Sequence, residues 1–523
     1  MTRESPAKGR TRRIDWRVSL PTAICCLLLL GSTAHSQSKD PDDKQAEEQI
    51  RRSLERITAV FDAVSKHLAD PVDPEKAIYE GAIPGAVSRL DPFSVFLDRD
   101  QFQSLQQQQR GVRQGFGAVL SVQAGKVTVL QSVQDSPFGR AGLGPGDHVV
   151  RINGHRVASL DLEELVQVLQ EARSGKVLLS VLQSGSVVAR DFELDPSEVP
   201  SPTVDKKILL EARLGYLHVA RIEQSTPGEI EQALAEWKER DLRGLLLDFR
   251  DNPGGSLDAA VETTGLFLPE DKTVVSLQGR AIPARSYRTA AGPHYARLPL
   301  VVLLNERSAS AAEIIAAALQ EHDRAWLVGK QSFGKGVVES VLPLSEGAAL
   351  VLTTARYVTP LGRSVQKPLP GTALAGILEQ GPSEFVTEKG RPLREVGGVL
   401  PDEIAEPWRL EDWTVWLQQS TAFVNFAEAY LERHGKVGED FRADEGILKE
   451  FEGFLRQAGF SVLEQQWQQA LPFIRMRIEA EIFNLVFGIA KGDEVEVRAD
   501  PQVQAAAAVI QKAEELLTRA GTP

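Results

Sequence analysis

The sequence predicts a multidomain protein of mixed α/β and α+β class, in which an α/β core lies between two helical regions. The chain has 523 residues, which is more than one hydrophobic core usually organises. Helical periodicity dominates residues 37–103 and 407–523, whereas short strands with Gly-rich turns fill residues 104–198. Strands and helices alternate over residues 199–406, which predicts the α/β core.

Residues 1–36 have the layout of a secretory signal peptide. Lys and Arg residues cluster before Val18, an apolar stretch continues to about Gly31, and small residues follow up to Ser36. The alternative is an uncleaved membrane anchor, but an apolar run of roughly 14 residues is short for a bilayer span. We therefore expect cleavage near Ser36 and a protein exported to the periplasm or cell envelope.

Composition excludes several classes of function. Both cysteines, Cys25 and Cys26, lie in the predicted signal peptide, so the rest of the chain has no disulfide, no Cys nucleophile and no Cys-bound metal. A net charge of −13 would repel the phosphates of nucleic acid. The histidines are scattered singly, and no Walker loop or zinc motif is present. We therefore predict no metal, no cofactor and no nucleic-acid partner.

The region from 37 to 103 is predicted to be helical. Its first helix is amphipathic, because apolar residues recur at helical spacing at Ile50, Leu54, Ile57, Val60, Phe61 and Val64. A second, short helical stretch is expected over residues 74–100.

Residues 104–198 are predicted to form a small domain of strands and two helices. The strands are expected at Val127–Val133, Val149–Ile152, Leu178–Leu182 and Val187–Phe192, and the helices at Ser136–Ala141 and Leu160–Glu171. The segment "AGLGPGDHVVRINGHRV" is rich in turn residues and then forms a strand ending in Asn-Gly. Through this segment the domain resembles a PDZ domain inserted ahead of the α/β core.

A PDZ domain binds the C-terminus of a peptide as an added strand and holds its carboxylate with backbone N–H groups. The resemblance therefore implies that Gly115, Phe116, Gly117 and Ala118 form the carboxylate-binding loop, with Phe116 lining the pocket for the last side chain. The alternative for this segment is an ordinary Gly-rich hairpin.

The core from 199 to 406 is predicted to be a sheet with helices on both faces, because its strands are continuous apolar runs. The expected strands are Leu214–Ala220, Leu242–Phe249, Leu298–Leu304, Val337–Leu344 and Ala349–Tyr357, and the expected helices are Pro227–Lys238 and Ala311–Gln320.

Ser310 lies between a buried strand and a helix, which makes it a candidate nucleophile. Free backbone N–H groups and the helix dipole favour negative charge at a helix N-terminus. The spacing Ser310-x-x-Glu313 is also that of a capping box. From these residues alone, Ser310 is a cap, a nucleophile or both.

Lys335 lies between Gly334 and Gly336, just before a predicted strand. Burial of a lysine in a tight apolar turn disfavours its charged form, and Ser–Lys pairs hydrolyse amides without histidine. One alternative is a solvated surface lysine. Another is the Ser332-x-x-Lys335 spacing of penicillin-recognising enzymes, which needs a helical turn that the two glycines oppose.

The segment "VVLLNERSASAAEIIAAALQEHDRAWLVGKQSFGKGVVES", with "LGYLHV", "RGLLLDFRDNPGG", "ARYVTPLGRSVQ" and "GVLPDEI", resembles the C-terminal processing (tail-specific) serine proteases that carry a PDZ domain. The resemblance covers roughly residues 55–405. It implies a serine endopeptidase that binds the free C-terminal tail of protein substrates. Ser310 would then be the nucleophile and Lys335 the general base, acting through an acyl-enzyme. Gly254 and Gly255 would form the oxyanion hole with the backbone N–H of Ser310.

Two positions depart from the family pattern. Glu339 stands where the family usually has Gln, and an ionised carboxylate would favour the ammonium form of Lys335. Phe93 stands in the "DPxS" segment where another aromatic residue or His is usual. The first departure leaves open a higher pH optimum or dependence on an adaptor protein. It also leaves a second hypothesis, a catalytically silent PDZ scaffold of the cell envelope.

The C-terminal helices from 407 to 523 carry no recognisable motif. We expect them to extend the core, form a homodimer interface or receive an adaptor.

Overall fold

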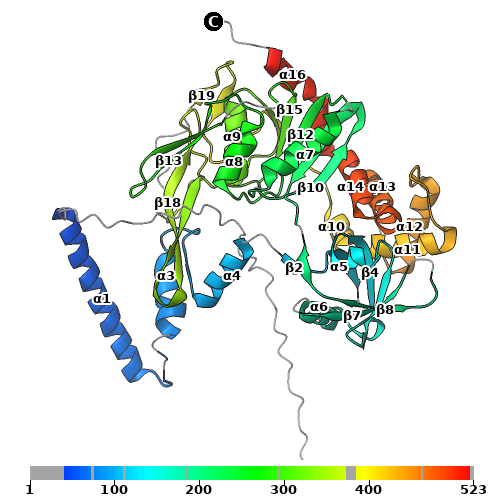
Figure 1. Ribbon diagram of the computed structural model, residues 1–523, viewed down its shortest axis with the longest axis horizontal. Helices are drawn as coiled ribbons and strands as arrows, with labels where there is room; N and C mark the ends of the chain where they lie inside the picture. Colours follow the sequence, from blue (N-terminus) through cyan, green and yellow to red (C-terminus); the bar gives the residue numbers. More distant parts are fainter. Residues whose placement is uncertain are drawn as a thin grey trace, which may run out of the picture.

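The computed structural model describes residues 41–518, apart from short gaps (Figure 1). These gaps are residues 72, 74–75, 110–112, 124, 134, 173–174, 184–185, 200, 239–240, 291–294, 373–383 and 461–462. The predicted signal peptide, residues 1–36, lies outside the described residues. No helix in the described ranges is both long enough and apolar enough to cross a membrane.

The N-terminal region begins with the predicted amphipathic helix, α1 (Pro41–His67). Figure 1 shows α1, in blue, standing apart from the large sheets of the protein, which are described below. Its apolar side chains are between 39% and 64% exposed at Ile50, Leu54, Ile57, Val60 and Val64. Because these residues recur every three or four positions, they form one exposed apolar stripe along α1.

The rest of the N-terminal region contains a strand that the sequence pattern did not predict. After η1 (Ala77–Ala82) and α3 (Ile83–Val87), β1 (Val95–Leu97) pairs antiparallel with a strand of the α/β core, and α4 (Arg99–Gln109) follows. The expectation of a helical stretch over all of 74–100 was therefore wrong at its end. A strand of three residues is too short to show the alternation by which strands are recognised.

The domain predicted to be a PDZ domain is a small antiparallel sheet with strand order β3-β4-β5-β7-β8. Its elements are β3 (Ala118–Gln123), β4 (Lys126–Ser132), α5 (Pro137–Arg140), β5 (His148–Ile152), β6 (His155–Arg156), α6 (Leu162–Ala172), β7 (Val177–Leu182) and β8 (Arg190–Leu194). The predicted elements are present, although the last strand begins at Arg190 rather than Val187. The edge strand β3 was not predicted. Pairing of β2 (Arg113–Gly115) with β9 (Ser197–Val199) brings together the entry and exit of the domain.

The α/β core contains a six-stranded sheet with order β10-β11-β12-β15-β16-β21. From β11 to β21 all neighbours are parallel, and β10 is antiparallel to β11. Every residue of β12 and β15 is buried, as expected for central strands of a covered parallel sheet. The strands are β10 (Val204–Leu209), β11 (Leu214–Val219), β12 (Gly244–Asp248), β15 (Leu300–Leu304), β16 (Trp326–Gly329) and β21 (Glu403–Ile404).

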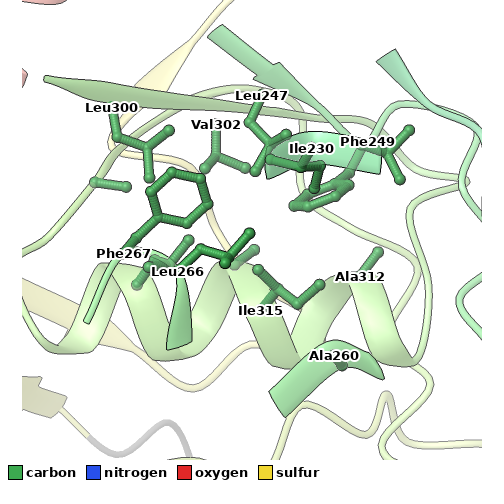
Figure 2. Packing of buried hydrophobic residues seen from close by; sticks show 14 of the residues in the cluster. Ile230, Leu247, Phe249, Ala260, Leu266, Phe267, Leu300, Val302, Ala312 and Ile315 are labelled. Carbon is green, nitrogen blue, oxygen red and sulfur yellow. The ribbon is translucent and has the colours of Figure 1, made fainter. Parts of the chain in front are cut away.

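Helices cover both faces of this sheet, as the sequence predicted. One face packs against α7 (Thr226–Lys238), α8 (Leu257–Gly265) and α9 (Ala311–Glu321). Figure 2 shows that core, with apolar side chains of the strands and helices meeting between them. The other face packs against α15 (Pro501–Ala508) and α16 (Ile510–Thr518), so the end of the chain completes the core.

A second sheet lies beside the first and has order β1-β18-β13-β14, with β17 also paired to β18. The strands β13 (Thr273–Gln278), β14 (Arg285–Arg288), β17 (Val337–Pro343) and β18 (Ala349–Val358) form it together with β1. The strands β19 (Glu384–Val386) and β20 (Pro392–Arg394) form a small hairpin, which lies between β18 and β21 in the sequence. The second sheet therefore joins the N-terminal region to the segment around Lys335.

The remaining C-terminal helices pack around an aromatic core of their own, which includes Phe426 and Phe451. They also contact the PDZ domain, because Lys126 Nζ lies 2.5 Å from Glu428 Oε2 and Leu130 packs against their core. The helices are α10 (Asp412–Gln419), α11 (Ala422–His434), α12 (Glu445–Gln457), α13 (Glu464–Phe487) and α14 (Ile489–Ala499).

Candidate active site

Ser310 lies at a sharp turn between β15 and α9. Its φ of 55° is positive and its ψ is −116°, a conformation that non-glycine residues seldom adopt and that costs about 1–3 kcal/mol. The surrounding turn supports it, since Ser308 Oγ donates to the Phe249 carbonyl at 2.8 Å and the Ala309 N–H donates to the Asn252 carbonyl at 2.9 Å. Ser310 is only 6% exposed, so the turn holds it in a defined orientation.

Lys335 is buried, as a general base would require. Its side chain is 5% exposed, which rules out the alternative of a solvated surface lysine. Its Nζ lies 2.8 Å from Glu339 Oε1 and 5.0 Å from the centre of the Phe93 ring. The sequence pattern gave no sign of the contact with Phe93, because it depends on the pairing of β1 with β18.

One buried carboxylate joins the Ser310 turn to the Lys335 loop. Glu313 Oε2 accepts hydrogen bonds from the backbone N–H groups of Ser310 (2.8 Å) and Lys335 (2.9 Å). Its Oε1 accepts from the Ser332 hydroxyl (2.5 Å) and the Gly334 N–H (2.8 Å). Burial raises the pKa of Glu313, and these four hydrogen bonds act in the opposite direction. The capping pattern predicted the first of these contacts, but the link to Lys335 was missed.

The glycines on either side of Lys335 allow the loop to pack closely on the core. Gly334 has φ of +90°, and a Cβ there would lie 2.8 Å from the Lys367 Cβ. A Cβ at Gly336 would lie 2.5 Å from the Gln366 backbone nitrogen. Residues 330–336 form no helix, so the Ser332-x-x-Lys335 spacing does not place these two side chains on one helical turn.

Glu339 is also buried, with 5% of its side chain exposed. Burial raises the pKa of Glu339, although the attraction of the Lys335 ammonium acts against this, and the nearby charge of Asp91 adds to the rise. Asp91 is held in place by hydrogen bonds from the Ser94 N–H and hydroxyl, at 2.8 and 2.9 Å. The N-terminal region therefore supplies both an aromatic ring and a carboxylate to the surroundings of Lys335.

The loop with Gly254 and Gly255 lies directly against the Ser310 turn. Gly254 has φ of +100°, and a Cβ there would lie 2.7 Å from the Ser310 Cβ, so only glycine fits without a shift. In this structure the Gly254 N–H donates to Asn252 Oδ1 at 2.8 Å, while the Ser310 N–H donates to Glu313. The predicted oxyanion hole is thus brought together in space, and its role as a hydrogen-bond donor stays a prediction.

Asp248 and Arg250 form a buried ion pair behind this loop. Arg250 donates to both oxygens of Asp248, and the Tyr216 hydroxyl donates to the same carboxylate at 2.7 Å. Burial would raise the pKa of Asp248, but the charge and hydrogen bonds of Arg250 hold it below its usual value. The sequence pattern gives no sign of this pair, although both residues lie in the "DFRDNPGG" segment.

The four residues predicted to bind a peptide carboxylate connect β2 to β3. Gly115 ends β2, and Ala118 begins β3, which is an edge strand of the PDZ sheet. Gly117 has φ of +69° and lies so close to Ser136 that a Cβ would be 2.1 Å from the Ser136 Cβ. Phe116 packs partly into the domain core. Peptide binding by this loop stays a prediction.

Among the described residues, no cluster of His, Asp and Glu side chains has the arrangement of a metal site. The α/β core carries a serine on a strained strand-to-helix turn, and a buried lysine is tied to that turn. Together with the predicted PDZ domain, this arrangement is that of a serine peptidase.

Comparison with known families agrees with this class. Three family models match the chain: "Peptidase family S41" over residues 213–373, "PDZ domain" over 128–183 and "Activating protease CtpB N-terminal domain" over 27–101. The chain therefore belongs to the carboxy-terminal processing proteases of peptidase family S41.

Similar proteins carry the corresponding names. The carboxy-terminal-processing protease of Bartonella bacilliformis is 32% identical over 61% of this chain and 74% of its own length. The carboxyl-terminal-processing protease of Synechocystis is 30% identical over 68% of this chain and 86% of its own length. The carboxy-terminal processing protease CtpB of Bacillus subtilis is 30% identical over 62% of this chain and 68% of its own length.

Proposed function

We propose that this serine endopeptidase cleaves protein substrates with Ser310 as nucleophile and Lys335 as general base. The observation that supports this most directly is that Glu313 Oε2 accepts hydrogen bonds from the backbones of both residues. This link holds the two catalytic segments together, and both residues are almost fully buried.

The reaction is an acyl transfer in two halves. Ser310 Oγ bonds to the carbonyl carbon of the scissile amide while its proton passes to the neutral amine of Lys335. The tetrahedral intermediate expels the substrate amine, which takes that proton, and an ester remains on Ser310. Water then attacks the ester while Lys335 takes its proton, and a second tetrahedral intermediate forms. When this intermediate breaks its bond to Ser310 Oγ, the proton passes from Lys335 to Oγ and the acid product leaves, so both residues return to their starting state. Backbone N–H groups of the Gly254–Gly255 loop and of Ser310 would stabilise the oxyanion, each by about 3 kcal/mol.

For Ser310 and Gly254 to donate to an oxyanion, their N–H groups must exchange their present acceptors, Glu313 and Asn252, for the substrate oxygen. Glu313 and Asn252 are themselves almost fully buried, so a small rearrangement of the loop is part of the proposed reaction. This requirement supports activation by substrate or by an adaptor protein.

The PDZ domain is the proposed site of substrate selection. Among the described residues the edge strand β3 pairs with a strand on one side alone, so a peptide can add on its other side, and the Gly115–Ala118 loop precedes it. The peptide carboxylate would bind the backbone N–H groups of this loop. Substrates are therefore proteins with an unblocked C-terminal tail.

The proposed setting is the periplasm or cell envelope, reached through the signal peptide of residues 1–36. A homodimer is supported by the exposed apolar stripe of α1, because its 3-and-4 spacing suits pairing with a second copy of the same helix.

Cleavage of an unstructured polypeptide by the protein and by Ser310→Ala tests this function. The substrate is offered with a free and with an amidated C-terminus. We expect no cleavage by the variant and weaker cleavage of the amidated substrate. Equal cleavage by both proteins would mean that another residue is the nucleophile, and equal cleavage of both substrates would rule out recognition of the tail carboxylate.

A further inference from the structure

Arg250 connects the loop beside Ser310 to the C-terminal helices. Its Nη1 donates to Asp500 Oδ2 at 2.8 Å and to Gln502 Oε1 at 2.9 Å, while Nε and Nη2 hold Asp248. Asp500 and Gln502 lie at the start of α15, beyond residues 213–373 that match the peptidase family. The guanidinium of Arg250 is therefore fixed from two sides by segments far apart in the sequence.

The backbone leads from Arg250 through Asp251 to Asn252, which contacts the serine turn. Asn252, two residues further on, is fully buried. Its carbonyl accepts from the Ala309 N–H at 2.9 Å, and its Oδ1 accepts from the Gly254 N–H at 2.8 Å. Ala309 directly precedes Ser310. A displacement of Arg250 would therefore shift the Gly254 N–H and the backbone next to Ser310, the proposed nucleophile.

The other end of this connection is equally well fixed. Gln502 is 3% exposed and donates from Nε2 to the Ala405 carbonyl at 2.8 Å. Val503, in the same turn of α15, packs with Leu246 and Val301 on the sheet. Because α15 is packed into the core, Asp500 presents its carboxylate to Arg250 from a rigid position.

We propose that Asp500 is a positioning residue for catalysis, which through Arg250 anchors the base of the loop of residues 251–255, from which the Gly254 N–H turns to the oxyanion. This rests on the proposed function, in which Ser310 attacks and that loop stabilises the oxyanion. The C-terminal helix α15 is then part of the catalytic unit. A displacement of about 1 Å at a reacting group costs on the order of a hundredfold in rate, so a small shift at Arg250 has a large effect.

The two oxygens of Asp500 have different partners, which allows their roles to be separated. Oδ1 caps α15 by accepting from the Gln502 and Val503 N–H groups at 2.7 and 3.3 Å, whereas Oδ2 faces Arg250. Asp500→Asn keeps a capping oxygen, because Asn caps helices as well as Asp, but it places an NH₂ group against Nη1 of Arg250. Asp500→Ser also caps and offers no charge to Arg250, so it serves as a second variant.

Asp444→Asn is the matched control. Asp444 caps α12 with a hydrogen bond from the Ile447 N–H to Oδ1 at 3.0 Å, in the same C-terminal region. Within the part of the chain that the structure describes, Asp444 forms no ion pair. This variant therefore reports the effect of an Asp-to-Asn change at a helix cap alone.

The test measures kcat and KM for fluorescent casein, the rate at which a fluorophosphonate probe labels Ser310, and the melting temperature. For Asp500→Asn and Asp500→Ser we expect kcat and the labelling rate to fall about tenfold to a hundredfold, with KM and the melting temperature nearly unchanged. Asp444→Asn is expected to match the parent protein in all four quantities. A purely structural role for Asp500 would instead lower the melting temperature without a selective loss of kcat.

Parent-like kcat and labelling in both Asp500 variants would overturn the proposal, as would a loss that Asp444→Asn reproduces. Casein cleavage by Ser310→Ala would overturn the proposed nucleophile instead. An inactive Ser310→Ala beside fully active Asp500 variants would remove only the positioning role, so the two failures can be told apart.

Discussion

Lys335 and Glu339 form an ion pair with an N–O distance of 2.8 Å, and the side chain of each is 5% exposed. An ionised carboxylate at this distance favours the ammonium form of the lysine, whereas a general base must be neutral. The charge of Asp91 nearby raises the pKa of Glu339 further, in addition to the effect of burial. If Lys335 is the general base, as proposed, the protonation of Glu339, whose pKa is raised by burial, sets the charge beside that base.

Glu339→Gln is expected to raise cleavage at neutral pH and to change the pH dependence of kcat, because it removes a buried carboxyl group of raised pKa beside the proposed base. The amide still accepts a hydrogen bond from Lys335 but no longer stabilises its positive charge. The measurement is kcat for an unstructured substrate across pH, compared with Glu346→Gln, which changes an exposed Glu in the turn between β17 and β18. An unchanged pH profile would show that Glu339 does not govern the protonation of the base.

Glu313→Gln is expected to remove most activity and to destabilise the protein by about 1–3 kcal/mol. The amide NH₂ group takes the place of one of the two accepting oxygens, so at least one buried N–H donor beside Glu313 loses its acceptor at a cost of about 1–3 kcal/mol. Unfolding in urea and kcat measure the two effects. Glu262→Gln makes the same change on the exposed surface of α8 and is expected to alter neither. Full activity of Glu313→Gln would contradict the link between the two catalytic segments.

Gly254→Ala is expected to lower kcat by at least a hundredfold. The new Cβ would lie 2.7 Å from the Ser310 Cβ and 2.8 Å from the Ala309 carbonyl oxygen, so the loop and the turn must separate. Gly362→Ala is a suitable control, because Gly362 has φ of +88° but no atom within 4 Å of its added Cβ. It should show the backbone strain of about 1–3 kcal/mol in stability, without loss of kcat. Similar kcat values for both variants would mean that contact with Ser310 is unimportant.

Local features of the active site could be predicted from the sequence, because they depend on neighbouring residues. The buried run before Ser310 and the apolar helix after it define a strand-to-helix turn, and the capping pattern identified Glu313 as a partner of the Ser310 N–H. The two glycines around Lys335 indicated a tight loop rather than a helix. Each of these structural features is determined by residues that are close together in the sequence.

The contacts that complete the site depend on pairing between distant segments. Phe93 reaches Lys335 because β1 pairs with β18, and Asp500 reaches Arg250 because α15 packs on the sheet. No spacing rule connects such positions, and a three-residue strand has no period to recognise. The closure of the second face of the sheet by α15 and α16 was one of three roles expected for the C-terminal helices, and the sequence could not choose between them.

The imidazole of His218 gives a prediction for stability against pH. Burial lowers the pKa of His218, but its hydrogen bond to Asp205 and the charges of Asp205 and Asp248 outweigh this and raise it above 6.5. A raised pKa means that the folded protein binds the proton more tightly than the unfolded chain does. The stabilisation from the protonated ring is therefore fully present below about pH 6.5 and is lost as pH rises through the folded pKa.

His218→Gln should therefore flatten the dependence of unfolding free energy on pH above about 6.5, where the parent protein loses stability. Gln keeps a hydrogen-bonding group beside Asp205 and the Arg250 carbonyl, to which His218 Nε2 lies at 3.1 Å, but it does not titrate. Urea unfolding at about pH 6, 7, 8 and 9 gives the slope of the unfolding free energy against pH for both proteins. His155→Gln, on the exposed strand β6, is the control and should keep the parent slope. A parent-like slope in His218→Gln would mean that the proton is not bound more tightly in the folded state.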